Sequence, residues 1–347
     1  MKAFRLVAPG KTDLVEIPRP EPGDDEALIR VQAAGVCHSD LHIIHSPAEA
    51  GFPLPMTLGH EIAGAVEIVG SGIKNFQIGQ QVAVYGIIGC GHCSACLRGK
   101  ENQCRLKPLG GIGLSRDGGM AEFVAVPATQ LISAEGIDPV QAAPLTDAGL
   151  TPFHAIDVSR ENLRPGAWCV VIGAGGLGHM ALQILRATSG ARVIALDTDE
   201  KARENAKMLG AEYAFPSDDS AVAKIRELVG RAPGGADVVL DFVGIQATLE
   251  IARKVVATGG NLTIIGLGAG ELKVVPTVGS DLLVPAETKI EMPFWGTKAE
   301  LLDVLHLSRH KMIEVQTQTF SLDEAPQVYQ RLEKRQIRGR AVILPNK

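Results

Sequence analysis

A glycine-rich motif behind an apolar segment constrains the fold of this chain more than any other feature. Residues 168–172 read WCVVI, GAGGLG follows at residues 173–178, and a segment with helical periodicity comes next. In such a unit the first glycine allows a tight turn, the second lets the backbone approach a pyrophosphate, and the third lets helix and strand pack closely. The motif therefore predicts a dinucleotide site that contains Gly173, Gly175, Gly176, Leu177 and Gly178.

An acidic residue stands where a dinucleotide site needs one. Asp197 ends the next apolar segment, 19 residues after Gly178, and a carboxylate there accepts hydrogen bonds from the ribose hydroxyls. The residues that follow, Thr198-Asp199-Glu200, add negative charge and offer no arginine for a 2′-phosphate. The sequence therefore favours NAD over NADP, and we interpret Asp199 itself as the N-cap of the next helix.

Short apolar segments alternate with helical segments through the second half of the chain. Five of the six expected strands lack polar alternation, as in a parallel sheet covered on both faces; the six span residues 168–172, 192–197, 211–215, 237–242, 261–265 and 289–294. Helical periodicity covers residues 177–188, 200–209, 220–229 and 247–256. This order predicts an α/β fold with a doubly wound parallel sheet, a Rossmann domain, over residues 153–295.

The remainder of the chain does not show this alternation of strands and helices. Short β-like runs broken by Gly and Pro, at residues 27–31, 63–69, 81–85 and 121–126, indicate a mostly antiparallel β domain. Two helical patterns and a last strand at 340–344 follow residue 298, and we expect this tail to return to the first domain. The expected catalytic domain comprises residues 1–152 and 296–347, with a cysteine-rich lobe at 88–106.

Composition limits the classes of molecule that we expect this protein to bind. The chain has 34 Lys and Arg against 39 Asp and Glu, a net charge of −5, and no long run of one sign. Nucleic acid and anionic membrane are therefore not expected partners, and a small molecule is. No apolar stretch reaches about 18 residues, and the first ten residues are too weakly apolar for a signal peptide. We expect a cytoplasmic protein.

The cysteine lobe indicates metal rather than disulfides. Six cysteines are too few for a disulfide scaffold in a chain of 347 residues. Four of them form CxxCxxC followed by seven residues and a last cysteine: Cys90, Cys93, Cys96 and Cys104. Such spacing closes a tetrahedral, structural zinc site. Iron–sulfur ligation is the alternative, but Arg105 stands where a proline usually follows the last cysteine, and a colourless protein would favour zinc.

A second set of metal-binding residue types lies earlier in the chain. Cys37 sits within GVCHSDLH at residues 35–42, and GHE follows at residues 59–61. A cysteine, a histidine and a carboxylate leave one zinc position open for water or substrate. The sixth cysteine, Cys169, lies inside an apolar strand and is expected to be a core residue.

Over essentially its whole length the sequence closely resembles the zinc-dependent medium-chain alcohol dehydrogenases, especially bacterial NAD-dependent secondary alcohol dehydrogenases. The resemblance is carried by GVCHSD at 35–40, GHE at 59–61, the four-cysteine lobe, LTDAGLT at 145–151 and the glycine-rich motif. Many relatives have cysteine where this chain has Asp147, and Gly-Asp where it has Gly79-Gln80. The resemblance implies a GroES-like catalytic domain beside the Rossmann domain.

The resemblance also implies roles for individual residues. Cys37, His60 and Asp147 would bind a catalytic zinc that lowers the pKa of a bound alcohol, with Glu61 as an adjacent carboxylate that enters the shell during ligand exchange. Ser39 and His42 would relay the alcohol proton, and Asp40 would hold His60. The remaining implied contacts are the pyrophosphate contacts His38 and Arg340, with Arg338 as a rival, and the pocket walls Phe52, Leu114 and Trp295.

The expected reaction is hydride transfer between a secondary alcohol or its ketone and NAD(H). A polyol, an amino alcohol or a primary alcohol and its aldehyde are alternative substrates for the same machinery. A zinc-ribbon nucleic-acid protein would need a basic face, and a zinc-free reductase would lack Cys37, His60 and the lobe. The implied cofactors are two zinc ions per subunit and NAD, and the implied assembly is a homo-oligomer, tetramer rather than dimer.

Overall fold

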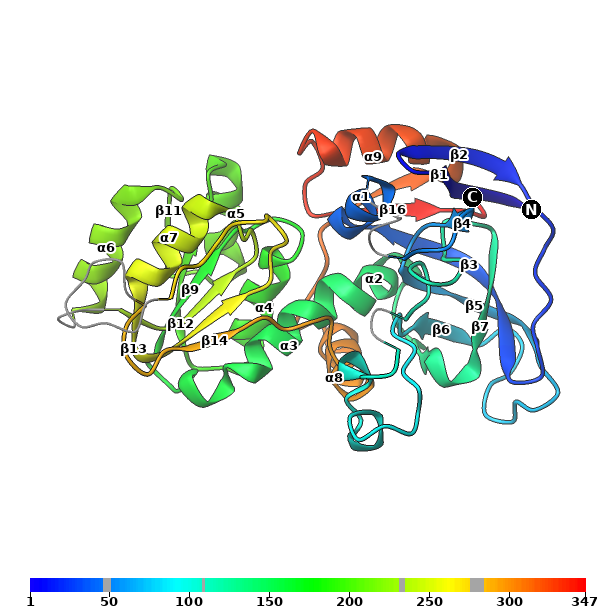
Figure 1. The fold of residues 1–347 in the computed structure, drawn as a ribbon, viewed down its shortest axis with the longest axis horizontal. Coiled ribbons are helices and arrows are strands. Elements are labelled where there is room, and N and C mark those ends of the chain that lie inside the picture. The colour runs from blue at the N-terminus through cyan, green and yellow to red at the C-terminus, as the bar shows by residue number, and fades with distance from the viewer. Residues whose placement is uncertain (46–50, 108–109, 231–234, 275–283) are drawn as a thin grey trace. The chain divides into compact units, whose positions relative to one another are not determined.

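The chain divides into two compact units in the computed structural model (Figure 1), which describes residues 1–45, 51–107, 110–230, 235–274 and 284–347. One unit comprises Met1–Leu150 and Gly296–Lys347, and the other comprises Thr151–Trp295. The helix α3 (Leu150–Val158) begins at the junction.

The unit Thr151–Trp295 is built on a parallel sheet. Its strand order among the described residues is β11-β10-β9-β12-β13-β14, and every neighbouring pair is parallel. The order reverses between β9 and β12, which is the topological switch point of a doubly wound sheet. The predicted α/β fold is therefore confirmed. The strands are β9 (Trp168–Ile172), β10 (Arg192–Leu196), β11 (Tyr213–Phe215), β12 (Ala236–Asp241), β13 (Val256–Ile264) and β14 (Lys289–Glu291).

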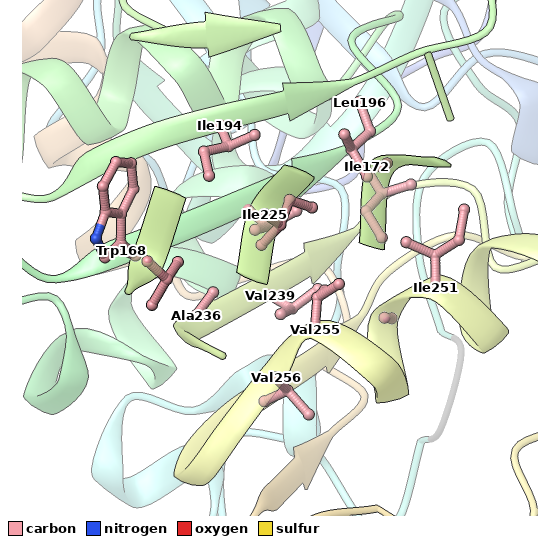
Figure 2. Packing of buried hydrophobic residues seen from close by; sticks show 14 of the residues in the cluster. Trp168, Ile172, Ile194, Leu196, Ile225, Ala236, Val239, Ile251, Val255 and Val256 are labelled. Atoms are coloured by element: carbon pink, nitrogen blue, oxygen red, sulfur yellow. The ribbon is translucent and has the colours of Figure 1, made fainter. Parts of the chain in front are cut away.

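Helices cover both faces of this sheet because its strands are apolar on both sides. The helices are α4 (Gly178–Thr188), α5 (Glu200–Leu209), α6 (Asp219–Val229) and α7 (Gln246–Val255). On one face Ile225 of α6 and Ile251 and Val255 of α7 pack against Ile172 and Val239 of the strands (Figure 2). Each such buried side chain stabilises the fold by about 1.5–3 kcal/mol.

Polar residues set where the helices of this unit begin. The Asp199 side chain accepts a hydrogen bond from the Ala202 N–H at the start of α5, and the Asp218 side chain accepts one from the Ser220 N–H at the start of α6. These bonds satisfy donors that the first turn of a helix leaves unpaired. The interpretation of Asp199 as an N-cap is thus confirmed.

The other unit is mostly antiparallel β structure. Its larger sheet has the order β15-β16-β3-β5-β6-β8, with β7 paired to β3, and its smaller sheet has the order β2-β1-β4. Among the pairs of strands described in this unit, only β15 and β16 run parallel. The strands are β1 (Lys2–Ala8), β2 (Lys11–Glu16), β3 (Glu26–Val36), β4 (Met56–Thr57), β5 (Glu61–Val69), β6 (Gln81–Val84), β7 (Phe123–Pro127), β8 (Leu131–Ser133), β15 (Thr317–Ser321) and β16 (Arg340–Leu344).

The tail of the chain completes this sheet. After the helices α8 (Lys298–Arg309) and α9 (Ala325–Glu333), strand β16 pairs antiparallel with β3, so the last strand returns to the first domain as expected. The short helices α1 (His38–His45) and α2 (Pro139–Pro144) complete the unit. None of the helices in the described parts of the chain is long and apolar enough to cross a membrane.

Candidate metal centres and nucleotide loop

Strand pairing brings the ligands of the expected catalytic site together. Cys37 directly follows β3 and His60 directly precedes β5, and these strands pair antiparallel with Gly35 opposite Glu61. Asp147 comes from a different element, a π-helical turn at Leu145–Gly149. A wide turn of this kind inside a helical segment is frequent at functional sites.

The donor atoms of this cluster fit a zinc ion. Cys37, His60, Glu61 and Asp147 are all buried, and one donor atom from each lies within 4.8 Å of all the others. Oδ2 of Asp147 lies 3.4 Å from Sγ of Cys37 and 3.5 Å from Nε2 of His60. Zinc bonds of about 2.0–2.3 Å around a tetrahedron separate the ligands by about 3.3–3.8 Å. A thiol, an imidazole and a carboxylate at these distances suit zinc.

Glu61 and Arg340 form a buried ion pair beside the cluster. Nε of Arg340 donates to Oε2 of Glu61 at 3.0 Å, and Nη2 donates to Oε1 of Glu61 and, at 3.2 Å, to Oδ2 of Asp147. Burial raises the pKa of Glu61 to about 7, although the guanidinium opposes that rise. A Cβ on Gly35 would lie 1.8 Å from Oε2 of Glu61, so the carboxylate requires glycine there.

Arg340 therefore binds two carboxylates, a role that the sequence analysis did not predict. It is the first residue of β16, next to the pairing of β16 with β3, and it is 3% exposed. Its rival, Arg338, is exposed. A pyrophosphate contact by either arginine stays a prediction.

A second buried carboxylate holds the imidazole. Oδ1 of Asp40 lies 3.2 Å from Nδ1 of His60, and Oδ2 of Asp40 accepts from the Cys37 N–H and the Tyr329 hydroxyl. Burial lowers the pKa of His60, but the charge of Asp40 and the hydrogen bonds around the ring outweigh it and raise this pKa well above its usual value. Tyr329 was missed by the sequence analysis, because it lies 289 residues from Asp40.

The remaining expected site residues of this unit lie on α1 and in loops. Ser39 is half-buried, with Oγ 3.5 Å from Sγ of Cys37, whereas His38 and His42 are exposed. Leu114 is buried and Phe52 is half-buried. Trp295 is buried and ends the other unit. A common pocket for Phe52, Leu114 and Trp295 stays a prediction.

The cysteine lobe is also arranged for a metal. Its four sulfur atoms lie within 4.8 Å of one another, with Cys93 Sγ 3.5 Å and Cys90 Sγ 3.9 Å from Cys96 Sγ. Backbone N–H groups of Cys96 and Arg105 lower the pKa of Cys93 to about 6, whereas burial raises that of Cys96 to about 12. All four atoms are sulfur, so the donor set fits a closed tetrahedral zinc site.

The glycine-rich motif has the geometry that a dinucleotide requires. Gly173 has a φ of +86°, and a Cβ on Gly178 would lie 1.8 Å from the carbonyl oxygen of Gly173. A Cβ on Gly175 would meet nothing within 4 Å. Gly176 and Leu177 are half-buried and lead directly into α4. In this loop, therefore, Gly173 has left-handed backbone, Gly178 is closely packed and Gly175 borders open space.

Asp197 directly follows β10 and is bonded to the same loop. Its Oδ2 accepts from the Ala174 N–H at 2.8 Å, and its Oδ1 accepts from the Asp199 N–H at 2.9 Å. Arg203 donates to the carbonyl oxygens of Asp197 and Thr198 rather than to the carboxylate. The loop, the start of α4 and the carboxylate therefore fit a dinucleotide with an unmodified ribose.

Together, the doubly wound sheet with its nucleotide loop and the two clusters of metal-binding side chains define a zinc-binding dehydrogenase. Residues 23–136 match the family model for the alcohol dehydrogenase GroES-like domain, and residues 176–309 match that for zinc-binding dehydrogenases. The predicted GroES-like and Rossmann architecture is confirmed by these two matches.

Full-length relatives point to the same family. The chain is 37% identical to an NAD-dependent alcohol dehydrogenase of Sulfurisphaera tokodaii, over 99% of this chain and 100% of that one. The solved alcohol dehydrogenase of Aeropyrum pernix has a TM-score of 0.91 at 34% identity, covering 99% of this chain and 100% of that one. Acetophenone reductase of Geotrichum candidum, solved with NAD, has a TM-score of 0.85 at 32% identity and covers 99% and 97%.

The chain belongs to the zinc-dependent medium-chain alcohol dehydrogenase family. The predicted enzyme class, an alcohol dehydrogenase that uses NAD, is confirmed by these matches. The roles of individual residues and the number of zinc ions stay predictions.

Proposed function

We propose that this protein transfers a hydride reversibly between secondary alcohols and NAD, with a zinc ion held by Cys37, His60 and Asp147. One observation carries the proposal: a buried thiol, imidazole and carboxylate converge in the chain that carries the NAD loop. A zinc ion there would supply Lewis-acid chemistry, which favours loss of the alcohol proton and then of hydride. The four cysteines of the lobe would hold a second, structural zinc ion.

The contacts of the two acidic residues support different roles for them. Oδ2 of Asp147 lies near both Cys37 and His60 and accepts one hydrogen bond from Arg340. Glu61 is bonded to Arg340 through both of its oxygens and also accepts the Ala148 N–H at 3.2 Å. We therefore assign Asp147 as the ligand and Glu61 as the adjacent carboxylate. Asp40 fixes the tautomer of His60 by accepting from its other ring nitrogen.

Ser39 and His42 supply a route for the alcohol proton in this proposal. Both lie on α1, three residues apart and therefore on one side of the helix, and Ser39 lies beside the ligand Cys37. Ser39 would take the proton from the alcohol, and the exposed His42 would pass it to solvent. His38, also exposed, and Arg340 would contact the pyrophosphate of NAD.

The substrate class rests on apolar side chains and on a relative. Phe52, Leu114 and Trp295, the expected pocket walls, carry no charge, which suits an aliphatic or aryl alcohol better than a polyol. Acetophenone reductase, whose name describes an aryl ketone substrate, is among the similar solved structures. We also propose a cytoplasmic homo-oligomer, with a tetramer favoured over a dimer.

A substrate panel tests the proposal. Purified protein is given propan-2-ol, 1-phenylethanol, ethanol, a sugar alcohol and an amino alcohol with NAD or NADP, and formation of reduced cofactor is measured. We expect the highest kcat/KM for a secondary alcohol with NAD. A higher kcat/KM for the sugar alcohol, the amino alcohol or ethanol would contradict the substrate class while leaving the enzyme class in place.

A further inference from the structure

A fully buried carboxylate lies at the switch point of the parallel sheet and has no role in the site described so far. Asp241 is the last residue of β12 and is 0% exposed. It pairs with Ile172 of β9, the residue before the nucleotide loop, and with Ile264 of β13. In doubly wound sheets the dinucleotide lies across the carboxyl ends of the strands at this reversal of strand order.

Asp241 fixes two loops at once. Oδ1 of its side chain accepts from the Val243 N–H at 2.9 Å and the Gly244 N–H at 3.0 Å. Its carbonyl oxygen accepts from the Ile265 N–H at 2.8 Å and the Gly266 N–H at 3.0 Å. The side chain therefore holds the loop after β12, and its backbone holds the loop after β13.

These two loops are in backbone contact, so a shift in one must move the other. A Cβ on Gly266 would lie 2.1 Å from the carbonyl carbon of Val243, and a Cβ on Gly244 would lie 2.2 Å from the carbonyl oxygen of Gly266. The Val243 side chain in turn packs on the nucleotide loop, because a Cβ on Gly173 would lie 2.6 Å from its Cγ2. Interfaces packed this closely transmit displacement instead of absorbing it.

We propose that Asp241 is a positioning residue that fixes the part of the site receiving the nicotinamide half of NAD. The inference rests on the proposed function. The adenosine half belongs to the other side of the switch point, where Asp197 and the glycine-rich loop lie at the ends of β10 and β9. The loops that Asp241 holds end β12 and β13, on the nicotinamide side.

Two ligands separate this role from a general structural one. ADP-ribose carries the adenosine, both phosphates and the second ribose, whereas NADH carries the nicotinamide as well. Titration calorimetry of the purified full chain measures the dissociation constants of both ligands. In Asp241→Ala the Val243 and Gly244 N–H groups lose their acceptor, and we expect the preference for NADH over ADP-ribose to fall about tenfold.

Two further variants set the scale. Asp241→Asn keeps an oxygen acceptor for the two N–H groups, so it should restore most of the preference for NADH. Asp237→Ala is the matched control: Asp237 lies at the other end of β12, and its carboxylate accepts the Trp168 N–H at 2.8 Å. It should lower the melting temperature without changing the ratio of the two dissociation constants.

The outcomes distinguish the two hypotheses. If Asp241→Ala weakens both ligands equally, or changes only stability as Asp237→Ala does, the positioning role is wrong. If Asp241→Ala does not accumulate as folded protein, Gly266→Ala displaces the same loop without altering the carboxylate, and it must then lower the preference for NADH. A wild-type protein that binds neither ligand would instead overturn the proposed function itself.

Discussion

At the scale of single residues, local contacts decide what each carboxylate does. Asp197 and Asp199 are two residues apart and carry the same charge, but Asp197 is bonded to the nucleotide loop and Asp199 to the first turn of α5. Likewise Asp147 places one oxygen within 3.5 Å of both Cys37 Sγ and His60 Nε2, whereas Glu61 is bonded to Arg340 through both of its carboxylate oxygens.

The first of these contrasts makes a quantitative prediction. Asp197→Ala removes the proposed acceptor for the ribose hydroxyls and should weaken NAD binding by about 1–3 kcal/mol. It should also reduce the preference for NAD over NADP, because a carboxylate no longer repels the 2′-phosphate. Calorimetry with both cofactors measures the two effects, and zinc content should not change.

Asp199→Ala is the matched control for that prediction. It removes a helix N-cap, so it should cost about 1 kcal/mol of stability and leave NAD affinity near the wild-type value. If Asp197→Ala kept the wild-type preference for NAD over NADP, selection of NAD would have to reside in other residues.

At the scale of the secondary-structure elements, the glycine-rich loop between β9 and α4 allows a test of where the pyrophosphate of NAD binds. The position of Gly175 has open space and that of Gly178 has none. A methyl group at Gly175 would lie where the second glycine lets a pyrophosphate approach. We expect Gly175→Ala to keep its melting temperature and to lose NAD affinity, measured by thermal unfolding and calorimetry.

Gly178→Ala, in contrast, should lower the stability of the fold. Its methyl group would lie 1.8 Å from the Gly173 carbonyl oxygen, so α4 must separate from β9 and the unfolding temperature must fall. If Gly175→Ala bound NAD as the wild type does, the proposed place of the pyrophosphate would be wrong.

The lobe is an element whose metal should serve stability. Removing one ligand in Cys93→Ser should release one zinc ion per chain and lower the unfolding temperature, since the free energy of metal binding there is folding free energy. The protein that stays folded should still oxidise alcohols. Elemental analysis, thermal unfolding and turnover are measured together.

Cys169→Ser is a control for any loss of a cysteine. Cys169 is fully buried in β9, outside the lobe, so its replacement should destabilise the protein without releasing zinc. If Cys93→Ser kept the full zinc content of the wild type, the prediction that the lobe binds zinc would be wrong.

At the scale of the whole molecule, the sequence predicts what short-range spacing determines. The parallel strands, the nucleotide loop and the cysteine lobe follow from motifs in which the interacting residues are close in the chain or repeat periodically. Asp147 is 110 residues from Cys37, and only the family resemblance implies that both bind one metal. In contrast, β3 extends to Val36, well beyond the predicted 27–31. The extension was not predicted because Ala33, Ala34 and Gly35 have low β propensity, and it is their pairing with β5 that places them in the strand.

Contacts between segments that are far apart in the chain could not be predicted from the sequence either. Arg340 meets Glu61 across 279 residues of sequence, and Tyr329 meets Asp40 across 289. No local pattern marks such pairs, since they depend on β16 returning to β3 and on α9 lying near α1. For this reason the sequence analysis missed the two carboxylates that Arg340 binds, while its contact with the pyrophosphate stays a prediction.

The central claim is that Cys37, His60 and Asp147 hold the zinc ion on which alcohol oxidation depends. Its most direct test is the rate of a secondary alcohol with saturating NAD, measured with zinc content and NAD affinity, for the wild type and Cys37→Ala. We predict that Cys37→Ala folds, binds NAD and keeps the lobe zinc, but loses about 10³-fold or more in turnover. Near-normal turnover by Cys37→Ala would contradict the assignment and make a metal-independent reductase the better description.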